Sequence, residues 1–138
     1  MPFPSAFTTG VVKRDPNTKS IEVTAIYWGP EGTNMGDVSV TGTDWGIGLS
    51  AQSGAKIPVD PVGGIVIARR HRQSFTLDVS KHAYFEIRIM GARQDEAGWS
   101  QYDFNVFALD KAGQTVPGNS FSRKQLAFIE TDDLSFLL

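Results

Sequence analysis

The chain has 138 residues, and its 13 lysines and arginines against 15 aspartates and glutamates give a formal net charge of -2. This balance argues against a general nucleic-acid-binding protein, because neutralising phosphates requires a clear basic excess. With 41% hydrophobic and 20% charged residues, the composition predicts one folded domain over residues 1–138 and argues against disorder.

The sequence contains no cysteine, which excludes disulfides, thiolate metal sites and cysteine nucleophiles together. No segment approaches the roughly 20 apolar residues that a membrane helix needs. The first residues lack the charged and apolar regions of a signal peptide. We therefore expect synthesis in the cytoplasm without a signal peptide and no transmembrane segment, and the sequence leaves the final location open.

The N-terminal third predicts an extended arm followed by a hairpin. Residues 1–5 form the arm, because two prolines fix its backbone and block a helix. Strands are predicted over 6–13 and 20–28, and the second alternates apolar with other residues. Pro16 and Asn17 between them favour a turn, so we expect these two strands to pair.

Three further strand signals follow in the middle of the chain. Alternation over 37–43 predicts a strand, and Gly46 and Gly48 just beyond it predict a bulge or a bend. The continuous apolar run at 65–68 predicts a strand that is buried on both faces. Alternation resumes over 74–79 and predicts another strand.

The clearest strand pair spans 83–90 and 99–109. In the first strand, Phe85, Ile87 and Ile89 share one face and are predicted to meet the core. Charged side chains on the opposite face predict that it is wet or partly covered. A turn at 110–114 follows the second strand, with Gly113 expected in the left-handed region. We expect the two strands to form a hairpin.

The C-terminal segment predicts a strand over 125–130 and an apolar tail over 134–138. Left free, the tail would be an exposed apolar patch, so it either pairs within its own sheet or contacts another subunit. The second option predicts a homo-oligomer. Taken together, the short strands and turns predict an all-β, single-domain antiparallel β-sandwich of jelly-roll or immunoglobulin-like type, with a closed barrel as the alternative.

Catalytic signals are weak. His71 and His82 are the only histidines, and no Gly-x-Ser-x-Gly motif is present. Two histidines eleven positions apart do not supply the close ligand spacing of a zinc site. No motif in the chain resembles a known family. We therefore predict that the protein is not an enzyme, and that it has no catalytic residues, no metal site and no cofactor.

The binding prediction depends on aromatic and basic residues at predicted strand ends. Trp28, Trp45 and Trp99 all lie at such junctions, where a flat aromatic face suits stacking on a sugar ring or burial in an interface. The alternative is that they close the ends of the core. Arg70 and Arg72 belong to the one dense basic cluster, 69–72, and guanidinium groups match phosphate, sulfate or acidic sugars.

The sequence thus predicts a non-catalytic binding module that recognises a carbohydrate or a cell-surface ligand through these five residues. The alternative is an oligomeric structural or assembly protein, such as a virion or particle subunit or a membrane-acting oligomer. In that case the tail and a sheet edge would join the copies.

Overall fold

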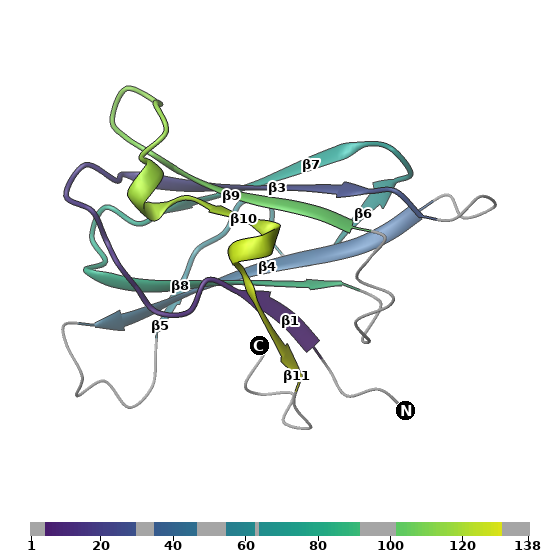
Figure 1. Cartoon of the computed structure of the whole chain (residues 1–138), viewed down its shortest axis with the longest axis horizontal. Helices are drawn as coiled ribbons and strands as arrows, with labels where there is room; N and C mark the ends of the chain where they lie inside the picture. The colour runs from purple at the N-terminus through teal and green to yellow at the C-terminus, as the bar shows by residue number, and fades with distance from the viewer. Residues whose placement is uncertain (1–4, 30–34, 47–54, 63, 92–101, 131–138) are drawn as a thin grey trace.

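The computed structural model describes residues 5–29, 35–46, 55–62, 64–91 and 102–130 of the chain. Within these ranges it contains strands and two single-turn 3-10 helices, labelled in Figure 1. The strands are β1 (Ser5–Thr8), β2 (Val12–Lys13), β3 (Ser20–Tyr27), β4 (Met35–Gly46), β5 (Ala55–Ile57), β6 (Ile65–Ala68), β7 (Arg72–Asp78), β8 (Tyr84–Gly91), β9 (Tyr102–Leu109), β10 (Phe121–Ser122) and β11 (Ala127–Glu130). The helices are η1 (Pro117–Asn119) and η2 (Arg123–Gln125).

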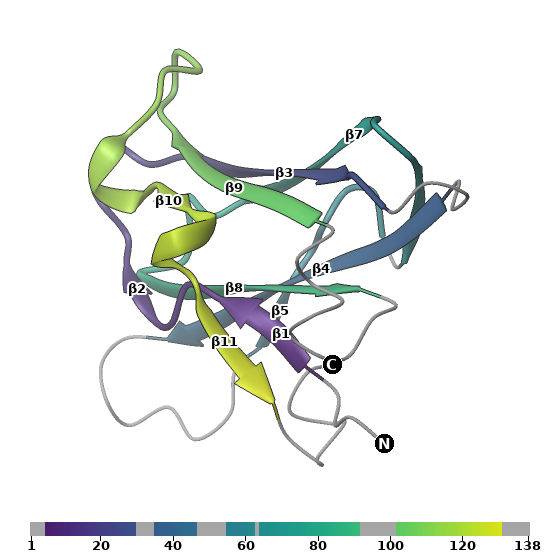
Figure 2. The ribbon, with the colours of Figure 1, turned by 45° about the vertical axis from the view of Figure 1, so that its right-hand side comes forward.

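The strands form two antiparallel sheets packed face to face (Figures 1 and 2). The first, sheet A, has the order β11-β1-β8-β4-β5, with β2 also paired to β8 and β6 to β4. The second, sheet B, has the order β10-β9-β3-β7. The predicted antiparallel β-sandwich is confirmed, and the described strands do not close into the barrel that was its alternative.

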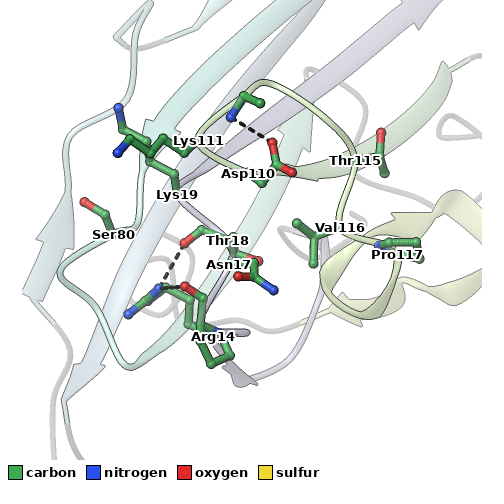
Figure 3. Close-up of a pocket in the computed structure, with 12 residues that line it drawn as sticks. Arg14, Asn17, Thr18, Lys19, Ser80, Asp110, Lys111, Thr115, Val116 and Pro117 are labelled. Atoms are coloured by element: carbon green, nitrogen blue, oxygen red, sulfur yellow. Dashed lines mark hydrogen bonds between the residues drawn. The ribbon is translucent and has the colours of Figure 1, made fainter.

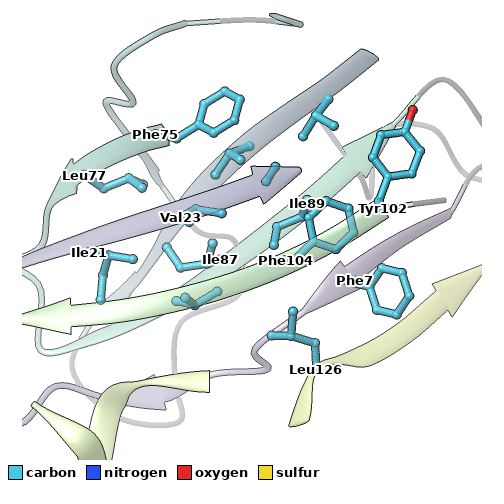
Figure 4. Packing of buried hydrophobic residues seen from close by; sticks show 14 of the residues in the cluster. Phe7, Ile21, Val23, Phe75, Leu77, Ile87, Ile89, Tyr102, Phe104 and Leu126 are labelled. Atoms are coloured by element: carbon cyan, nitrogen blue, oxygen red, sulfur yellow. The ribbon is translucent and has the colours of Figure 1, made fainter. Parts of the chain in front are cut away.

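The core lies between the sheets and is built by period-two alternation. Phe85, Ile87 and Ile89 of β8 are fully buried, which confirms the face predicted to meet the core. Sheet B supplies the opposing layer from alternate residues of β3, β7 and β9 (Figure 4). Aromatic rings fill one end, where Tyr102 stacks on Phe104 with ring centroids 5.7 Å apart. Burying these side chains is the main stabilising contribution.

Both predicted hairpins are wrong. The strands predicted over 83–90 and 99–109 do not pair, because β8 lies in sheet A and β9 in sheet B. The N-terminal strands likewise separate: β1 and β2 pair with β8, whereas β3 pairs with β7 and β9. In both cases the two strands lie in different sheets, so the partners that satisfy their backbone groups come from distant parts of the chain.

The local backbone predictions have mixed outcomes. Gly113 has φ 82° and its N–H donates to the carbonyl of Asp110 over 2.9 Å, as the predicted turn requires. The register of β4 shifts between Asp44 and Gly46, which confirms an irregularity at the first of the two glycines. The run at 65–68 is not buried on both faces, since Val66 is 60% exposed.

The outward face of β8 also differs from expectation. Glu86 and Arg88, predicted to lie on a wet or partly covered face, are only 5% and 6% exposed. They are buried as a hydrogen-bonded pair, with Arg88 Nη2 2.9 Å from Glu86 Oε1. Burial of two opposite charges is tolerated when they pair with good geometry, and the alternation pattern alone does not reveal such a partner.

Residues 1–4 of the predicted arm and the whole predicted tail at 134–138 lie outside the described residues, and Ser5 is the first residue of β1. Among the described residues, no helix is long and apolar enough to cross a membrane.

Candidate binding site

The end of β3 and the turn between β6 and β7 lie next to each other. The backbone N–H of Arg70 donates to the carbonyl of Tyr27 over 2.7 Å. Arg69 Nε donates to the carbonyls of Trp28 and Gly29, both at 3.2 Å. These bonds fix the Trp28 backbone against the arginine turn, although the two segments are about 40 residues apart in sequence.

Arg70 occupies the corner at which the chain leaves sheet A for sheet B. Its φ of 67° places it in the left-handed region, which a side chain other than glycine seldom adopts. The N–H of His71 closes the turn on the carbonyl of Ala68 over 3.0 Å. This backbone leaves Arg70 and His71 exposed at the sheet end.

Register places Arg72 on the outer face of sheet B, and strand alternation continued one residue beyond β3 assigns Trp28 to the same face. Ile26 of β3 pairs with Arg72 of β7 on one side and with Asp103 of β9 on the other. Trp28 is two residues beyond Ile26, so its side chain belongs to the same face. Its indole is 50% exposed, and both Arg72 and Asp103 are exposed.

Polar side chains continue on this outer face next to the Ile26 row, along three adjacent strands. Thr24 of β3 is flanked by Ser74 of β7 and Asn105 of β9. Hydroxyl and amide groups therefore continue from the Trp28 end toward the middle of the sheet. We call Trp28, Arg70, Arg72 and Asp103 the tryptophan–arginine patch. It offers a flat aromatic surface beside two cations and one carboxylate.

Trp45 is placed elsewhere. It lies in β4 of sheet A, and β3 and β4 end at opposite ends of the sandwich (Figure 1). Its indole N–H donates to Glu86 Oε1 over 3.0 Å, so its polar edge is used inside the protein. Trp99, the third predicted ligand-binding tryptophan, lies outside the described residues. The structure therefore joins Trp28 with the two predicted arginines and separates Trp45 from them.

Glu86 has the environment of a structural carboxylate. Burial raises the pKa of Glu86. The hydrogen bonds from Arg88, Thr8 and Trp45, together with the Arg88 charge, lower it by more than burial raises it, so the pKa lies below its usual value. Both carboxylate oxygens already accept hydrogen bonds, from Trp45 and Arg88 on one side and Thr8 Oγ1 on the other. An ionised and fully bonded carboxylate suits a structural role better than general acid catalysis.

The histidines do not form a catalytic constellation with the groups described. His82 Nδ1 lies 2.9 Å from Asp44 Oδ2. The pKa of Asp44 is lowered mainly by a hydrogen bond from the Gly46 backbone and, to a smaller extent, by the hydrogen bond from His82. The pair lines neither of the two hollows described below. In the described ranges, no three histidine, aspartate or glutamate side chains gather as a metal site would require.

A cavity of about 810 Å³ lies at the end of sheet B opposite Trp28, where β3 begins and β7 and β9 end (Figure 3). Arg14, Lys19 and Lys111 line it together with Asp110. Arg14 Nη1 donates to three backbone carbonyls, the closest being that of Thr18 at 3.0 Å. Asp110 accepts from two N–H groups of its own turn. These two groups stabilise the loops, which leaves mainly two exposed lysines to face a ligand.

Asn119 of η1 anchors the wall of that cavity. Its Oδ1 accepts from the N–H of Asp15 at 2.6 Å and from Thr18 Oγ1 at 3.0 Å, and its Nδ2 donates to the carbonyl of Lys13 at 3.3 Å. The residue is 5% exposed. Sequence reasoning missed this role of Asn119, because its three partners lie about 100 residues away.

Comparison of the chain with protein-family models, with curated proteins and with solved structures finds no match. The candidate site therefore rests on geometry alone. Of the hollows and patches in the described residues, the tryptophan–arginine patch combines an exposed tryptophan with two exposed arginines, and the backbone N–H of Arg70 is bonded to the carbonyl of Tyr27.

Proposed function

We propose that the protein is a non-catalytic binding module that recognises an acidic carbohydrate through the tryptophan–arginine patch. The observation that carries this proposal is the half-exposed indole of Trp28 on the same outer face as Arg72, beside the turn of Arg70. An indole presents a large flat surface at low entropic cost, and a sugar ring offers a matching apolar face.

The charged and polar neighbours define the ligand class. The guanidinium groups of Arg70 and Arg72 can each pair with a carboxylate or a sulfate in a two-pronged arrangement. Asp103 and Asn105 supply acceptors and donors for ring hydroxyls on the same face. An extended acidic oligosaccharide fits this row of groups better than a compact ion does, because the groups follow adjacent strands about 4.8 Å apart.

The test is a screen of neutral and acidic oligosaccharides on a glycan array, followed by calorimetry with the best ligand. We expect Trp28→Ala to lower the affinity at least tenfold while circular dichroism and the melting temperature stay unchanged, since the side chain is half exposed. Arg72→Gln should weaken acidic ligands and spare their neutral counterparts.

Phe107→Ala is the matched control. Phe107 is an exposed aromatic on the same outer face, but it pairs with Glu22, six residues from Trp28 along β3 and therefore about 20 Å away. Binding that survives Trp28→Ala, or is lost equally with Phe107→Ala, would contradict the assignment of the patch. Absence of binding to every acidic ligand would reject the proposed function itself.

Assembly with other copies is the second candidate, supported by one observation. In the order of described strands β11 stands at the end of sheet A, and a free strand edge is a template for pairing with another chain. Ala127 of β11 is exposed, so Ala127→Lys should break an edge-to-edge dimer. Light scattering that shows a monomer before and after this substitution would argue against assembly through β11.

A further inference from the structure

An apolar pocket of about 480 Å³ lies along β4 in sheet A. This strand changes its partner along one edge: β6 pairs with Met35–Val38, and β5 pairs with Gly42–Asp44. Residues 39–41 lie in the interval between the two partner strands and line the pocket. The hollow is therefore an interruption of the sheet, in which a ligand has the room that a continuous strand would fill.

The outer wall of the pocket is held firmly in place. Pro58, Val59 and Val62, from the connection between β5 and β6, form this wall. Asp60 in the same segment exchanges two backbone hydrogen bonds with Thr76 of β7, at 3.0 and 2.8 Å. The wall is thus fastened to sheet B, and the cavity is preformed in the way typical of small-molecule sites.

The lining is mostly apolar, but it contains the buried hydroxyl of Thr41, which has no hydrogen-bond partner among the described residues. Val59, Val62 and Met90 face the hollow together with the aliphatic floor from Val40 and Ile57. Val62 is 83% exposed, so its side chain is accessible to a ligand at the mouth of the cavity. Buried hydroxyls normally have a partner, so a ligand acceptor or donor would satisfy that of Thr41.

One charge borders the pocket. Lys56 of β5 is the only charged residue in its described lining. It pairs with Thr43 across the strands, and Glu86 lies beyond Thr43 on β8. Burial lowers the pKa of Lys56 below its usual value, and the nearby Arg88 charge adds to this, while Glu86 opposes it. Because Glu86 is already bonded to Arg88, Thr8 and Trp45, an anion at this position would give the ammonium group a partner of its own.

We propose that this pocket binds a single amphiphile, an aliphatic chain with a carboxylate head, whose chain lies against Val59, Val62 and Met90 and whose head meets Lys56 and Thr41. The apolar lining accounts for the chain, and the cation beside an unpartnered hydroxyl accounts for the anionic head. This site lies on sheet A and is separate from the tryptophan–arginine patch on sheet B.

The test compares sodium dodecanoate with dodecanol, both below the concentrations at which they aggregate, by NMR titration of the full chain. We expect saturable shifts of the Val59, Val62 and Met90 methyl groups and tighter binding of dodecanoate. Lys56→Gln should weaken dodecanoate roughly tenfold, the effect of losing one charge-assisted hydrogen bond, and leave dodecanol unchanged. Lys19→Gln, which removes the same charge at the far end of sheet B, is the matched control.

Two further variants separate the site from the stability of the fold. Thr41→Val removes the unpartnered hydroxyl at constant shape, so the melting temperature should hold or rise while dodecanoate affinity falls. Val62→Asp alters an exposed side chain and should weaken both ligands. Equal affinity for dodecanoate and dodecanol that Lys56→Gln does not change would overturn the proposal. So would binding to phosphatidylglycerol vesicles without binding of monomeric dodecanoate, or an absence of methyl shifts.

Discussion

Gly42 provides a sharp test of how the two sheets pack. It lies in β4 between Ile87 of β8 and Ile57 of β5. A Cβ atom added to Gly42 would overlap Leu77 Cδ2 of β7 and would lie 3.2 Å from Ile57 Cβ. Sheet B therefore approaches sheet A so closely here that no side chain fits without movement of the core.

The expected effect of Gly42→Ala follows from two opposing terms. Restricting the unfolded chain stabilises the protein by about 0.4–1 kcal/mol when the native backbone accepts alanine. Overpacking a filled core costs about 1–3 kcal/mol, and both Leu77 and Ile57 are buried. We therefore expect a net loss of about 1–2 kcal/mol in the free energy of unfolding.

Urea unfolding followed by tryptophan fluorescence measures this loss. The control is Gly118→Ala, because an added Cβ there meets nothing within 4 Å, and this variant should be neutral or slightly more stable. Leu77→Val in the Gly42→Ala background should recover part of the loss, since the colliding methyl group moves away. A Gly42→Ala variant as stable as the parent, or one that shows no coupling to Leu77→Val, would refute the close contact between the sheets.

Three other predictions concern the buried network, the anchored loops and the left-handed corner. Glu86→Gln should lower the free energy of unfolding by about 3 kcal/mol at pH 7. The folded pKa of Glu86 is below its ordinary value of 4.5. The difference in stability between the variant and the parent should therefore be complete above pH 4.5 and should disappear as the pH falls through the folded pKa. An unchanged difference at acidic pH would count against the ionised pair. Asn119→Ala should cost about 2 kcal/mol or more by leaving the Asp15 N–H and the Thr18 hydroxyl without an acceptor, and amide exchange of Asp15 should report the loss directly. Arg70→Gly should raise the melting temperature, since glycine adopts φ 67° without strain, and should weaken the binding of acidic glycans; a fall in stability would show that the side chain supports the corner.

Period-two alternation was sufficient to predict which side chains face the core. Phe85, Ile87 and Ile89 alternate with charged residues and are fully buried against the core, although Glu86 and Arg88 between them are buried as well, on the opposite face of the sheet. The same pattern could not predict strand partners, because alternation is identical whichever sheet a strand joins. The wrong hairpins arose from assuming that neighbouring strands pair. In this sandwich the two strands of each predicted hairpin lie in different sheets, and β8 finds its main partner in β4, 38 to 53 residues earlier in the sequence.

The candidate sites illustrate the same limit. Trp28 and Arg72 could be selected as residue types suited to sugars, but only the pairing of β3 with β7 brings them onto one face. The apolar pocket gave no sequence signal at all. It arises because β5 and β6 pair with different stretches of β4, and the length of the unpaired interval is a property of register rather than composition.

The different chemistry of the two outer faces bears on which one meets a carbohydrate. At the centre of sheet A, Glu86 and Arg88 are buried and bonded to each other. A ligand that separated them would leave two buried charges without their partners, which is strongly unfavourable. At the centre of sheet B, Ser74 and Asn105 flank the buried Thr24. They are half-buried, uncharged donors and acceptors that can exchange water for ring hydroxyls at little net cost. An extended polar ligand is therefore better accommodated on sheet B, where Trp28 ends the row. On sheet A, the feature suited to a ligand is instead the apolar pocket where β5 and β6 pair with different stretches of β4.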